Sequence, residues 1–250
     1  MGPFILEAEG LTKDFGGFVA VSGVDLRVRR GTIHALIGPN GAGKTTVFNL
    51  LTKFLQPSAG RITYKERDIT RLRPALVARL GMVRSFQISA VFPHLTVRDN
   101  VRVALQRRVG TSFHFWRKGR TLDSLNDRAD ALIASVGLRD FTNELAADLA
   151  YGRRRALEIA TTLALEPELL LLDEPMSGLG REDIGRVSEL IRKVGRDHTV
   201  LMVEHNLSVV AALSDTITVM ARGQVLAEGP YAQVCKNSDV RAAYLGSSHA

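Results

Sequence analysis

The feature that most restricts the fold is a glycine-rich segment at residues 38–46, which reads Gly-Pro-Asn-Gly-Ala-Gly-Lys-Thr-Thr. It satisfies the pattern G-x-x-x-x-G-K-[ST]. A compact apolar segment, residues 32–37, precedes it, and a helical pattern with apolar residues at 47, 50, 51 and 55 follows it. A strand that leads into a glycine-rich loop and then a helix is the context in which this pattern binds phosphate. The segment therefore predicts an α/β fold with a phosphate loop.

Each residue type in this loop has a physical use toward the phosphates of a nucleotide. Glycine lets successive backbone N–H groups turn inward as an anion nest. The helix that begins near Lys44 points the positive end of its dipole at the phosphates. Lys44 adds a compact cation, and the Thr45 hydroxyl can ligate Mg²⁺. The expected nucleotide-binding residues of the loop are Gly38, Pro39, Asn40, Gly41, Ala42, Gly43, Lys44, Thr45 and Thr46.

An acidic pair later in the chain supplies a second part of such a site. The apolar run at residues 169–172 has no polar alternation, as expected of a parallel strand covered on both faces, and it ends in Asp173, Glu174 and Pro175. Asp173 would hold Mg²⁺, through water. Glu174 would orient and polarise an attacking water molecule. A strand that merely ends in solvated acids is the alternative.

Strand-like and helical segments alternate along most of the chain, which predicts a mostly parallel α/β sheet. The first 35 residues read as short strands broken at Gly10, at Gly16 and Gly17, at Gly23 and at Gly31. Residues 88–152 differ, because they are rich in Arg, Asp, Asn and Ala with helical periodicity. We expect one domain over residues 1–250, with a nucleotide-binding core at 1–87 and 153–250 that has an N-terminal antiparallel β region, and an inserted α-helical subdomain at 88–152.

Composition narrows the cellular context without naming a partner. The formal charge of +7 and the sequence pI of about 9.9 are compatible with nucleic acid, an anionic membrane surface, an anionic small ligand or an arginine-rich solvated surface. No stretch approaches the roughly 18 consecutive apolar residues of a membrane helix. No secretory or myristoylation signal is expected at the start. The single cysteine, Cys235, cannot form an internal disulfide, which suits a reducing cytosol.

Taken in order, the motifs resemble those of ABC-transporter ATPase subunits over essentially the whole chain. The ordered set comprises the phosphate loop, Ser85-Phe86-Gln87, Leu149-Ala150-Tyr151-Gly152, residues 169–175, Ser177-Gly178-Leu179 and His205. The resemblance implies a P-loop NTPase of the ABC type that hydrolyses ATP with Mg²⁺. Its catalytic residues would be Glu174, His205, Lys44 and Gln87.

The resemblance also implies roles for three residues that would be unremarkable alone. Phe15 falls where the family places an aromatic ring against adenine, whereas a core phenylalanine is the alternative. Gln87 matches a glutamine that contacts Mg²⁺ and water, so that Thr45, Gln87 and Asp173 would surround the metal. His205 matches a histidine that touches the γ-phosphate, although a lone histidine is most often a surface or core residue.

The signature loop departs from the family pattern, which is usually Leu-Ser-Gly-Gly-Gln. Ala150, Tyr151, Gly152 and Arg153 stand at the positions that would contact the ATP of a partner subunit. Ala150 cannot donate the serine hydroxyl, and losing one charge-assisted hydrogen bond costs roughly 1.5–3 kcal/mol. Gly180 also replaces the aspartate usual in the next loop. We therefore expect a heterodimer with one strong and one weak site, and a homodimer remains open.

Several details look like the ATPase subunits of branched-chain amino-acid importers. They are Ser85-Phe86-Gln87, residues 95–101, the signature tyrosine, residues 174–179 and residues 243–246. The resemblance implies transmembrane permease subunits, a second ATPase subunit, an indirect periplasmic or extracellular solute-binding protein, no nucleic acid, and a peripheral location on the cytoplasmic face of the inner membrane. A lipopolysaccharide-export ATPase, a nucleic-acid-associated ABC-type ATPase and a small-molecule kinase are the alternatives.

Overall fold

The computed structural model describes residues 2–85, 91–109 and 125–245. The chain divides into two compact units. The first unit consists of Met1–Arg84, Glu168–Pro175 and Ile191–Ala250. The second, the helical unit, consists of Ser85–Pro167 and Met176–Leu190.

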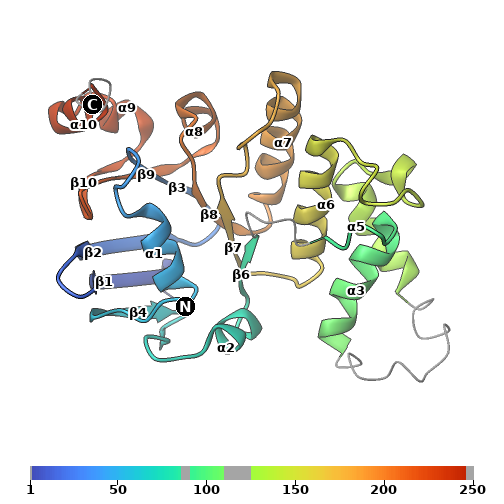
Figure 1. Ribbon diagram of the computed structural model, residues 1–250, viewed down its shortest axis with the longest axis horizontal. Coiled ribbons are helices and arrows are strands. Elements are labelled where there is room, and N and C mark those ends of the chain that lie inside the picture. Colours follow the sequence, from blue (N-terminus) through green and yellow to red (C-terminus); the bar gives the residue numbers. More distant parts are fainter. Residues whose placement is uncertain (1, 86–90, 110–124, 246–250) are drawn as a thin grey trace. The chain divides into compact units, whose positions relative to one another are not determined.

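The larger sheet of the first unit has six strands in the order β10-β9-β3-β8-β7-β6 (Figure 1). Their bounds are Ile33–Ile37 (β3), Met82–Ser85 (β6), Leu169–Asp173 (β7), Thr199–Val203 (β8), Thr216–Ala221 (β9) and Gln224–Gly229 (β10). The neighbours from β9 through β3 and β8 to β7 are parallel, and β10 is antiparallel to β9. Every residue of β3, β7 and β8 is buried, because parallel strands are covered on both faces. The predicted mostly parallel sheet is confirmed.

A second, four-stranded sheet in the order β2-β1-β4-β5 forms the N-terminal β region. The bounds of its strands are Phe4–Asp14 (β1), Val19–Arg29 (β2), Ala59–Tyr64 (β4) and Arg67–Asp68 (β5). All three pairings are antiparallel, as predicted.

The expected strand breaks at Gly10 and Gly23 are wrong, because β1 and β2 run through both glycines. Each glycine has a positive φ, 58° at Gly10 and 61° at Gly23, and the register of the two strands shifts around Leu11. Side chains satisfy the displaced N–H groups: Gly10 donates to Asp25 Oδ1 at 2.7 Å and Gly23 donates to Thr12 Oγ1 at 3.0 Å. The glycines therefore make β-bulges that bend long strands instead of ending short ones.

Helix α1, Lys44–Leu51, joins the hydrophobic cores of both sheets. Its buried residues belong to one cluster with residues of β1 and of β3, β7 and β8. The helix ends at Leu51, earlier than the expected pattern through Leu55, because the chain turns left-handed at Lys53 with a φ of 66°. The other helices with residues in this unit are Pro74–Arg79 (α2), Arg181–Val194 (α7, its last turn), Leu207–Leu213 (α8), Tyr231–Val234 (α9) and Ser238–Leu245 (α10).

Three helices that stand side by side in Figure 1 form the main part of the helical unit within its described residues. They are Val97–Val109 (α3), Asn126–Ser135 (α5) and Tyr151–Leu163 (α6), and the short 3₁₀ helix η1 covers Arg139–Phe141. Helix α6 packs against α3 and α5. For this reason it lies in the helical unit, which is larger than the expected range 88–152 and includes the first ten residues of α7 as well.

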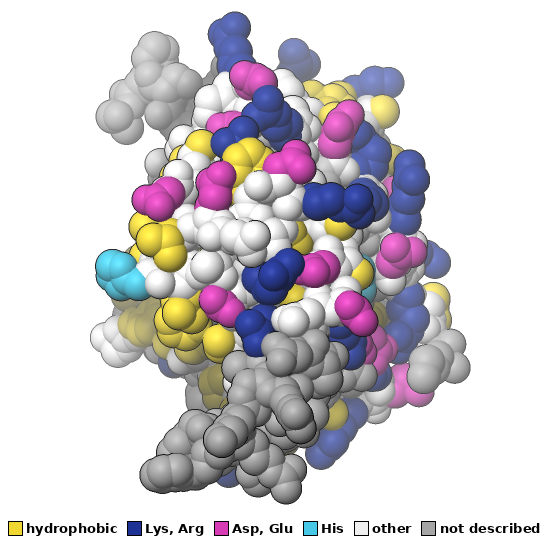
Figure 2. Space-filling model, turned by 90° about the vertical axis from the view of Figure 1, so that its right-hand side faces the viewer, with side chains coloured by type: hydrophobic (Ala, Val, Ile, Leu, Met, Phe, Trp, Pro, Cys, Tyr) yellow, Lys and Arg dark blue, Asp and Glu magenta, His cyan; other side chains and the backbone are white. Residues whose placement is uncertain are grey.

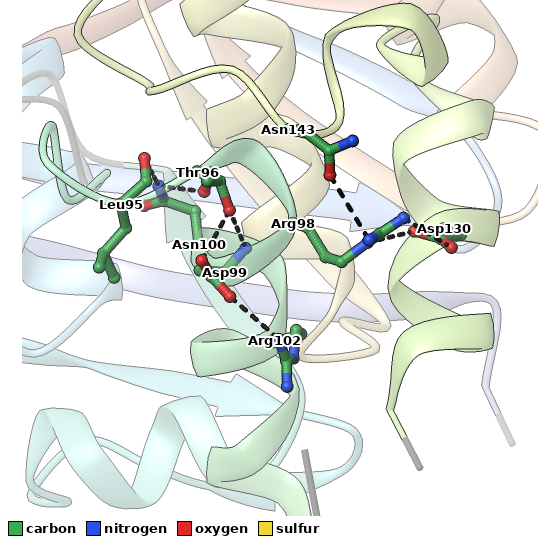
Figure 3. A network of polar contacts seen from close by, with 8 residues as sticks. All are labelled: Leu95, Thr96, Arg98, Asp99, Asn100, Arg102, Asp130 and Asn143. Atoms are coloured by element: carbon green, nitrogen blue, oxygen red, sulfur yellow. Dashed lines mark hydrogen bonds and ion pairs between the residues drawn. The ribbon is translucent and has the colours of Figure 1, made fainter. Parts of the chain in front are cut away.

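A polar network fixes the start of α3 and ties it to α5 (Figure 3). Thr96 Oγ1 accepts from the Asp99 N–H at 3.1 Å and donates to the Asp99 carboxylate at 2.7 Å, so the threonine hydroxyl caps the helix and the carboxylate holds that hydroxyl in place. Arg98 forms a two-pronged ion pair with Asp130 of α5, at 2.9 and 3.2 Å. The described residues of this region are mainly helical, as predicted.

The described helices and surface bear on two expectations from composition. No helix in the described ranges is both long enough and apolar enough to span a membrane. On the face shown in Figure 2, Lys and Arg side chains are interspersed with Asp and Glu side chains. The positive net charge is therefore not gathered into a patch of one sign on that face.

Candidate functional site

Three of the expected functional segments follow neighbouring strands of the larger sheet. The phosphate loop follows β3, Asp173 is the last residue of β7 and is followed by Glu174, and His205 comes just after β8. Because β3, β8 and β7 are adjacent and parallel, their carboxyl ends lie at one edge of the sheet. Ligands of α/β sheets bind at this edge. The structure thus brings together residues that are far apart in the sequence.

Two glycines of the phosphate loop are required by close backbone packing. Gly38 has a φ of 152°, and a Cβ there would lie 2.2 Å from the Met220 carbonyl oxygen. Gly43 has a φ of 96°, and a Cβ there would lie 2.7 Å from the Ala20 carbonyl oxygen. No side chain fits at either position, so the loop can follow its path only with glycine.

Lys44 is buried and held inside the loop. Its Nζ donates to the carbonyl oxygens of Gly38 at 2.7 Å and Pro39 at 2.9 Å. Burial lowers the pKa of Lys44, and the carboxylates of Glu174 and Asp173 oppose this shift. The ammonium group therefore lies in a site whose nearby negative charges come from the acidic pair, where an incoming phosphate would be an additional partner.

Most of the remaining loop residues are accessible. Asn40, Gly41 and Thr45 are exposed, Pro39 and Thr46 are half-buried, and Ala42 is buried. The Ala42 carbonyl accepts from the Gly223 N–H at 3.1 Å, which anchors the loop beside the end of β9. Thr45 is the second residue of α1, so its exposed hydroxyl is available at the helix start.

Asp173 is fully buried and has an unexpected partner. Its Oδ2 forms an ion pair with the Arg84 guanidinium, whose side chain is 10% exposed. Arg84 also donates to Asn49 Oδ1 at 2.6 Å. Asp173 Oδ1 is buried without a hydrogen-bond partner among the described residues. A carboxylate oxygen without a hydrogen-bond partner is a suitable ligand for Mg²⁺, directly or through water, so the residues fit a metal here.

Glu174 adopts a backbone conformation that is uncommon for a residue with a side chain. Its φ is 46°, in the left-handed region, and its N–H donates to the Val203 carbonyl at 2.9 Å. Such a conformation costs on the order of 1–3 kcal/mol and persists where surrounding structure enforces it. The bond to Val203 joins the ends of β7 and β8 and fixes the direction in which the half-buried Glu174 side chain leaves the sheet.

His205 is exposed, and the residue before it holds its loop in place. The buried Glu204 carboxylate accepts from the backbone N–H groups of His205 at 2.9 Å and Asn206 at 3.0 Å. The Asn206 side chain in turn caps α8 by accepting from Ser208 and Val209. The position of His205 is thus set by a chain of hydrogen bonds from the sheet to the next helix.

The other expected residues lie outside this edge of the sheet or outside the described residues. Phe15 is 48% exposed in the turn between β1 and β2, so it is not a core phenylalanine, and the Lys13 ammonium lies 5.1 Å from its ring centroid. Gln87 lies outside the described residues.

The signature residues begin α6 in the helical unit. Ala150 is the N-cap and provides no side-chain cap. Tyr151 donates from its hydroxyl to the Ser177 carbonyl at 3.3 Å, and the Arg153 guanidinium stacks 3.9 Å from the centroid of the Phe141 ring. A Cβ on Gly152 would lie 2.4 to 2.8 Å from the atoms of the Asp183 carboxyl group, so this position accepts only glycine without displacement.

Sequence reasoning missed Arg84, Asn49 and Glu204. Arg84 carried a local signal, since a charged residue in the short strand Met82–Ser85, otherwise mostly buried, needs a buried partner. Glu204 carried a similar signal directly after an apolar strand. Asn49 carried none, because only the fold places its amide beside Arg84.

A glycine-rich loop with a buried lysine, an acidic pair and a histidine at adjoining strand ends defines a phosphate-loop nucleotide-binding protein. A model of the ABC transporter family matches residues 21–177. A model described as "Branched-chain amino acid ATP-binding cassette transporter" matches residues 224–250.

Two curated relatives match along the whole chain. The chain is 41% identical over 251 residues to the high-affinity branched-chain amino acid transport ATP-binding protein LivG of Salmonella typhimurium, with 98% of each sequence covered. It is 41% identical over 254 residues to the corresponding protein BraF of Pseudomonas aeruginosa, again with 98% of each covered.

Solved structures of ATP-binding cassettes are also similar to this chain. A nucleotide-free ATP-binding cassette from an ABC transporter is 27% identical and superimposes with a TM-score of 0.84, over 96% of this chain and 98% of that one. The ADP conformation of an ATP-binding cassette is 28% identical, with a TM-score of 0.85 over 97% and 99%. The chain belongs to the ABC transporter family of ATP-binding subunits, whose members bind nucleotide and hydrolyse ATP.

Proposed function

We propose that the chain is the ATP-hydrolysing subunit of an importer for branched-chain or related amino acids. It would work on the cytoplasmic face of the inner membrane, attached to transmembrane permease subunits that receive solute from a binding protein. The observation that carries the ATPase role is the meeting of the phosphate loop, the acidic pair and the His205 loop at one sheet edge. The solute class rests on the similarity to LivG and BraF and on the match at residues 224–250. These similarities give no support to lipopolysaccharide export or to a nucleic-acid role.

The residues expected to bind and hydrolyse ATP have distinct roles in this proposal. Backbone N–H groups of the phosphate loop and Lys44 bind the phosphates. Thr45, Asp173 and Gln87 would hold Mg²⁺, which neutralises phosphate charge when bound. Glu174 orients and polarises the attacking water, His205 contacts the γ-phosphate, and Phe15 stacks on adenine.

The signature residues would complete a site on a second subunit. Tyr151, Gly152 and Arg153 lie at the start of α6, where backbone N–H groups and the helix dipole favour a phosphate. Ala150 brings no hydroxyl to that phosphate. We therefore propose a heterodimer in which a different ATPase subunit supplies the signature that faces the phosphate loop of this chain. The site completed by Ala150 would then be the weaker of the two.

Uptake of radiolabelled leucine tests the solute class directly. Cells that lack this chain would be supplied with the wild-type chain or with Lys44→Ala. The wild type restores uptake of leucine, and Lys44→Ala does not, because its phosphate loop lacks the buried cation. Uptake of an unrelated sugar is unaffected by either. Unrestored leucine uptake by a chain that co-purifies with permease subunits would refute the solute class and leave the ATPase role standing.

Co-purification tests the assembly. The tagged chain is pulled down from detergent-solubilised native membranes. Two permease subunits and a second, different ATPase are the expected companions. Recovery of this chain as the sole ATPase would refute the heterodimer. Recovery of nucleic acid in place of membrane proteins would refute the transport role.

A further inference from the structure

Arg84 bridges three elements of the first unit from one buried guanidinium group. It extends from β6, pairs with Asp173 at the end of β7 and donates to Asn49 of α1 at 2.6 Å. The guanidinium carbon also lies 5.8 Å from the centroid of the Phe48 ring. A planar guanidinium can satisfy two acceptors in fixed directions, whereas a lysine ammonium acts as a point charge. The bridge therefore constrains the angles between its partners as well as their distances.

Burial makes this bridge a strong constraint on the Asp173 side chain. The Asp173 side chain is 0% exposed and that of Arg84 is 10% exposed. Removing one partner of a buried ion pair leaves an uncompensated charge, so the pair stays closed in the folded protein. With Oδ2 held by Arg84, the rotation of the carboxylate is fixed and Oδ1 is left as the oxygen without a hydrogen-bond partner among the described residues.

The second contact links this carboxylate to the phosphate loop. Asn49 lies on α1, which begins at Lys44, the lysine of the loop. Arg84 thus connects the Asp173 carboxylate, whose Oδ1 is proposed to bind Mg²⁺, with the helix that begins at the phosphate-binding lysine. Mg²⁺ demands nearly ideal octahedral geometry, so small changes in the placement of a ligand matter more to Mg²⁺ than to Ca²⁺.

We propose that Arg84 is a positioning residue that orients Asp173 and thereby sets the Mg²⁺ dependence of nucleotide binding. This inference rests on the proposed function of the site. Orientation outweighs repulsion between the guanidinium and Mg²⁺, because the charge of Arg84 is already balanced by the carboxylate that it holds. Residues that orient metal ligands typically change metal affinity by about 10–100-fold when they are removed.

Nucleotide binding measured as a function of Mg²⁺ tests the proposal without hydrolysis. A fluorescent, non-hydrolysable ATP analogue is bound to the full-length chain, and Mg²⁺ is titrated from EDTA upward. Arg84→Gln raises the Mg²⁺ concentration at half-maximal binding about tenfold. Binding in EDTA stays at the wild-type level, because the phosphate loop is unchanged. Arg84→Lys keeps the positive charge but loses the planar, two-pronged guanidinium group. It raises the Mg²⁺ concentration at half-maximal binding by less than Arg84→Gln does.

Two further variants keep the result interpretable. Asn49→Ala removes one acceptor of Arg84 and raises the same midpoint by less than Arg84→Gln does. If circular dichroism shows that Arg84→Gln does not fold, Asn49→Ala and Arg84→Lys are used in its place. Arg98→Gln removes a more exposed Arg–Asp pair from the helical unit and leaves the midpoint unchanged.

The outcomes separate the inference from the proposed function. An unchanged or lowered Mg²⁺ midpoint in the folded variants overturns the role of Arg84, since a competing cation would lower the midpoint and a purely structural pair would leave it unchanged. A wild-type chain whose analogue binding does not respond to Mg²⁺ at all contradicts the proposed function instead.

Discussion

Lys53 combines an unfavourable backbone conformation with a buried, charged side chain. It follows the end of α1 with a φ of 66°, a conformation that favours glycine. Its side chain is buried, with 3% of the residue exposed, and Nζ has no hydrogen-bond partner among the described residues. Burial lowers the pKa of Lys53 to about 8, although the charge of Asp68 opposes the shift. Both the backbone and the ammonium group of this residue therefore reduce stability.

Lys53→Gly should stabilise the protein by about 1–2 kcal/mol, because it relieves the left-handed strain and removes a buried unpaired amine. For a chain of this size the melting temperature would rise by about 4 °C, measured by calorimetry. Lys53→Met keeps the strained backbone but removes the amine, so it should give only part of the gain. A lower melting temperature in Lys53→Gly would show that Lys53 has a stabilising partner.

Burial of His34 should make the stability of the fold depend on pH. It is 1% exposed, and its Nε2 lies 2.7 Å from Thr218 Oγ1. Thr218 gives its one hydroxyl proton to the Glu228 carboxylate at 2.6 Å, so the Nε2–H of a neutral His34 must be the donor to Thr218. Burial lowers the pKa of His34 to about 4 from its usual 6.5.

Because the unfolded chain binds a proton at His34 that the folded chain rejects, stability should fall as the pH drops from 6.5 toward 4. The loss is about 3 kcal/mol in full, and it is absent above pH 6.5. Urea unfolding between pH 4.5 and 7.5 measures it. His34→Gln keeps a donor for Thr218. It should reduce the slope of the unfolding free energy against pH by the equivalent of about one bound proton. Parallel slopes in the two proteins would contradict the assignment.

At the scale of elements, the loop between β8 and α8 is held by one carboxylate. Glu204→Ala removes the acceptor for the N–H groups of His205 and Asn206. ATP turnover should fall about tenfold while apparent ATP affinity changes little, because a misplaced catalytic group affects the transition state more than the ground state. Hydrogen exchange of the 204–213 segment should rise, and Glu204→Gln should recover part of both effects.

Asp215→Ala is the matched control for that experiment. Asp215 also accepts a backbone N–H, that of Ile33 at 2.8 Å, but it lies at the amino end of β3, opposite the phosphate loop. Its loss should lower stability without a selective loss of turnover. Equal losses of turnover in Asp215→Ala and Glu204→Ala would indicate general destabilisation.

The strands that carry the site could be predicted because β3, β7 and β8 are short, mostly apolar segments. Gly10 and Gly23 were misread, since a glycine of positive φ looks the same in sequence whether it makes a turn or a bulge. The pair of Arg84 and Asp173 joins positions 89 residues apart, and it exists only because the fold places β6 at the sheet edge beside β7. Local pattern cannot supply such a contact.

At the scale of the whole molecule, Glu174→Gln separates binding from hydrolysis. The variant keeps the phosphate loop and Lys44, so it should bind ATP with nearly wild-type affinity. It loses the carboxylate that polarises water, so turnover should fall by at least about 100-fold. With ATP the variant should accumulate as a closed assembly with the second ATPase subunit proposed above, measured by light scattering. Retained hydrolysis would remove Glu174 from its proposed role.

The order of strands in the larger sheet also has a consequence for synthesis on the ribosome. β3 ends at Ile37, yet its two neighbours are β8 and β9, and β9 ends at Ala221. At roughly 5–20 residues per second, this fully buried strand waits roughly 10–40 seconds for both partners. During that time the nascent chain carries an apolar strand with two unpaired edges. A chain terminated before residue 199 would keep both edges bare, so we expect it to be captured by chaperones or to aggregate instead of accumulating as a smaller folded domain.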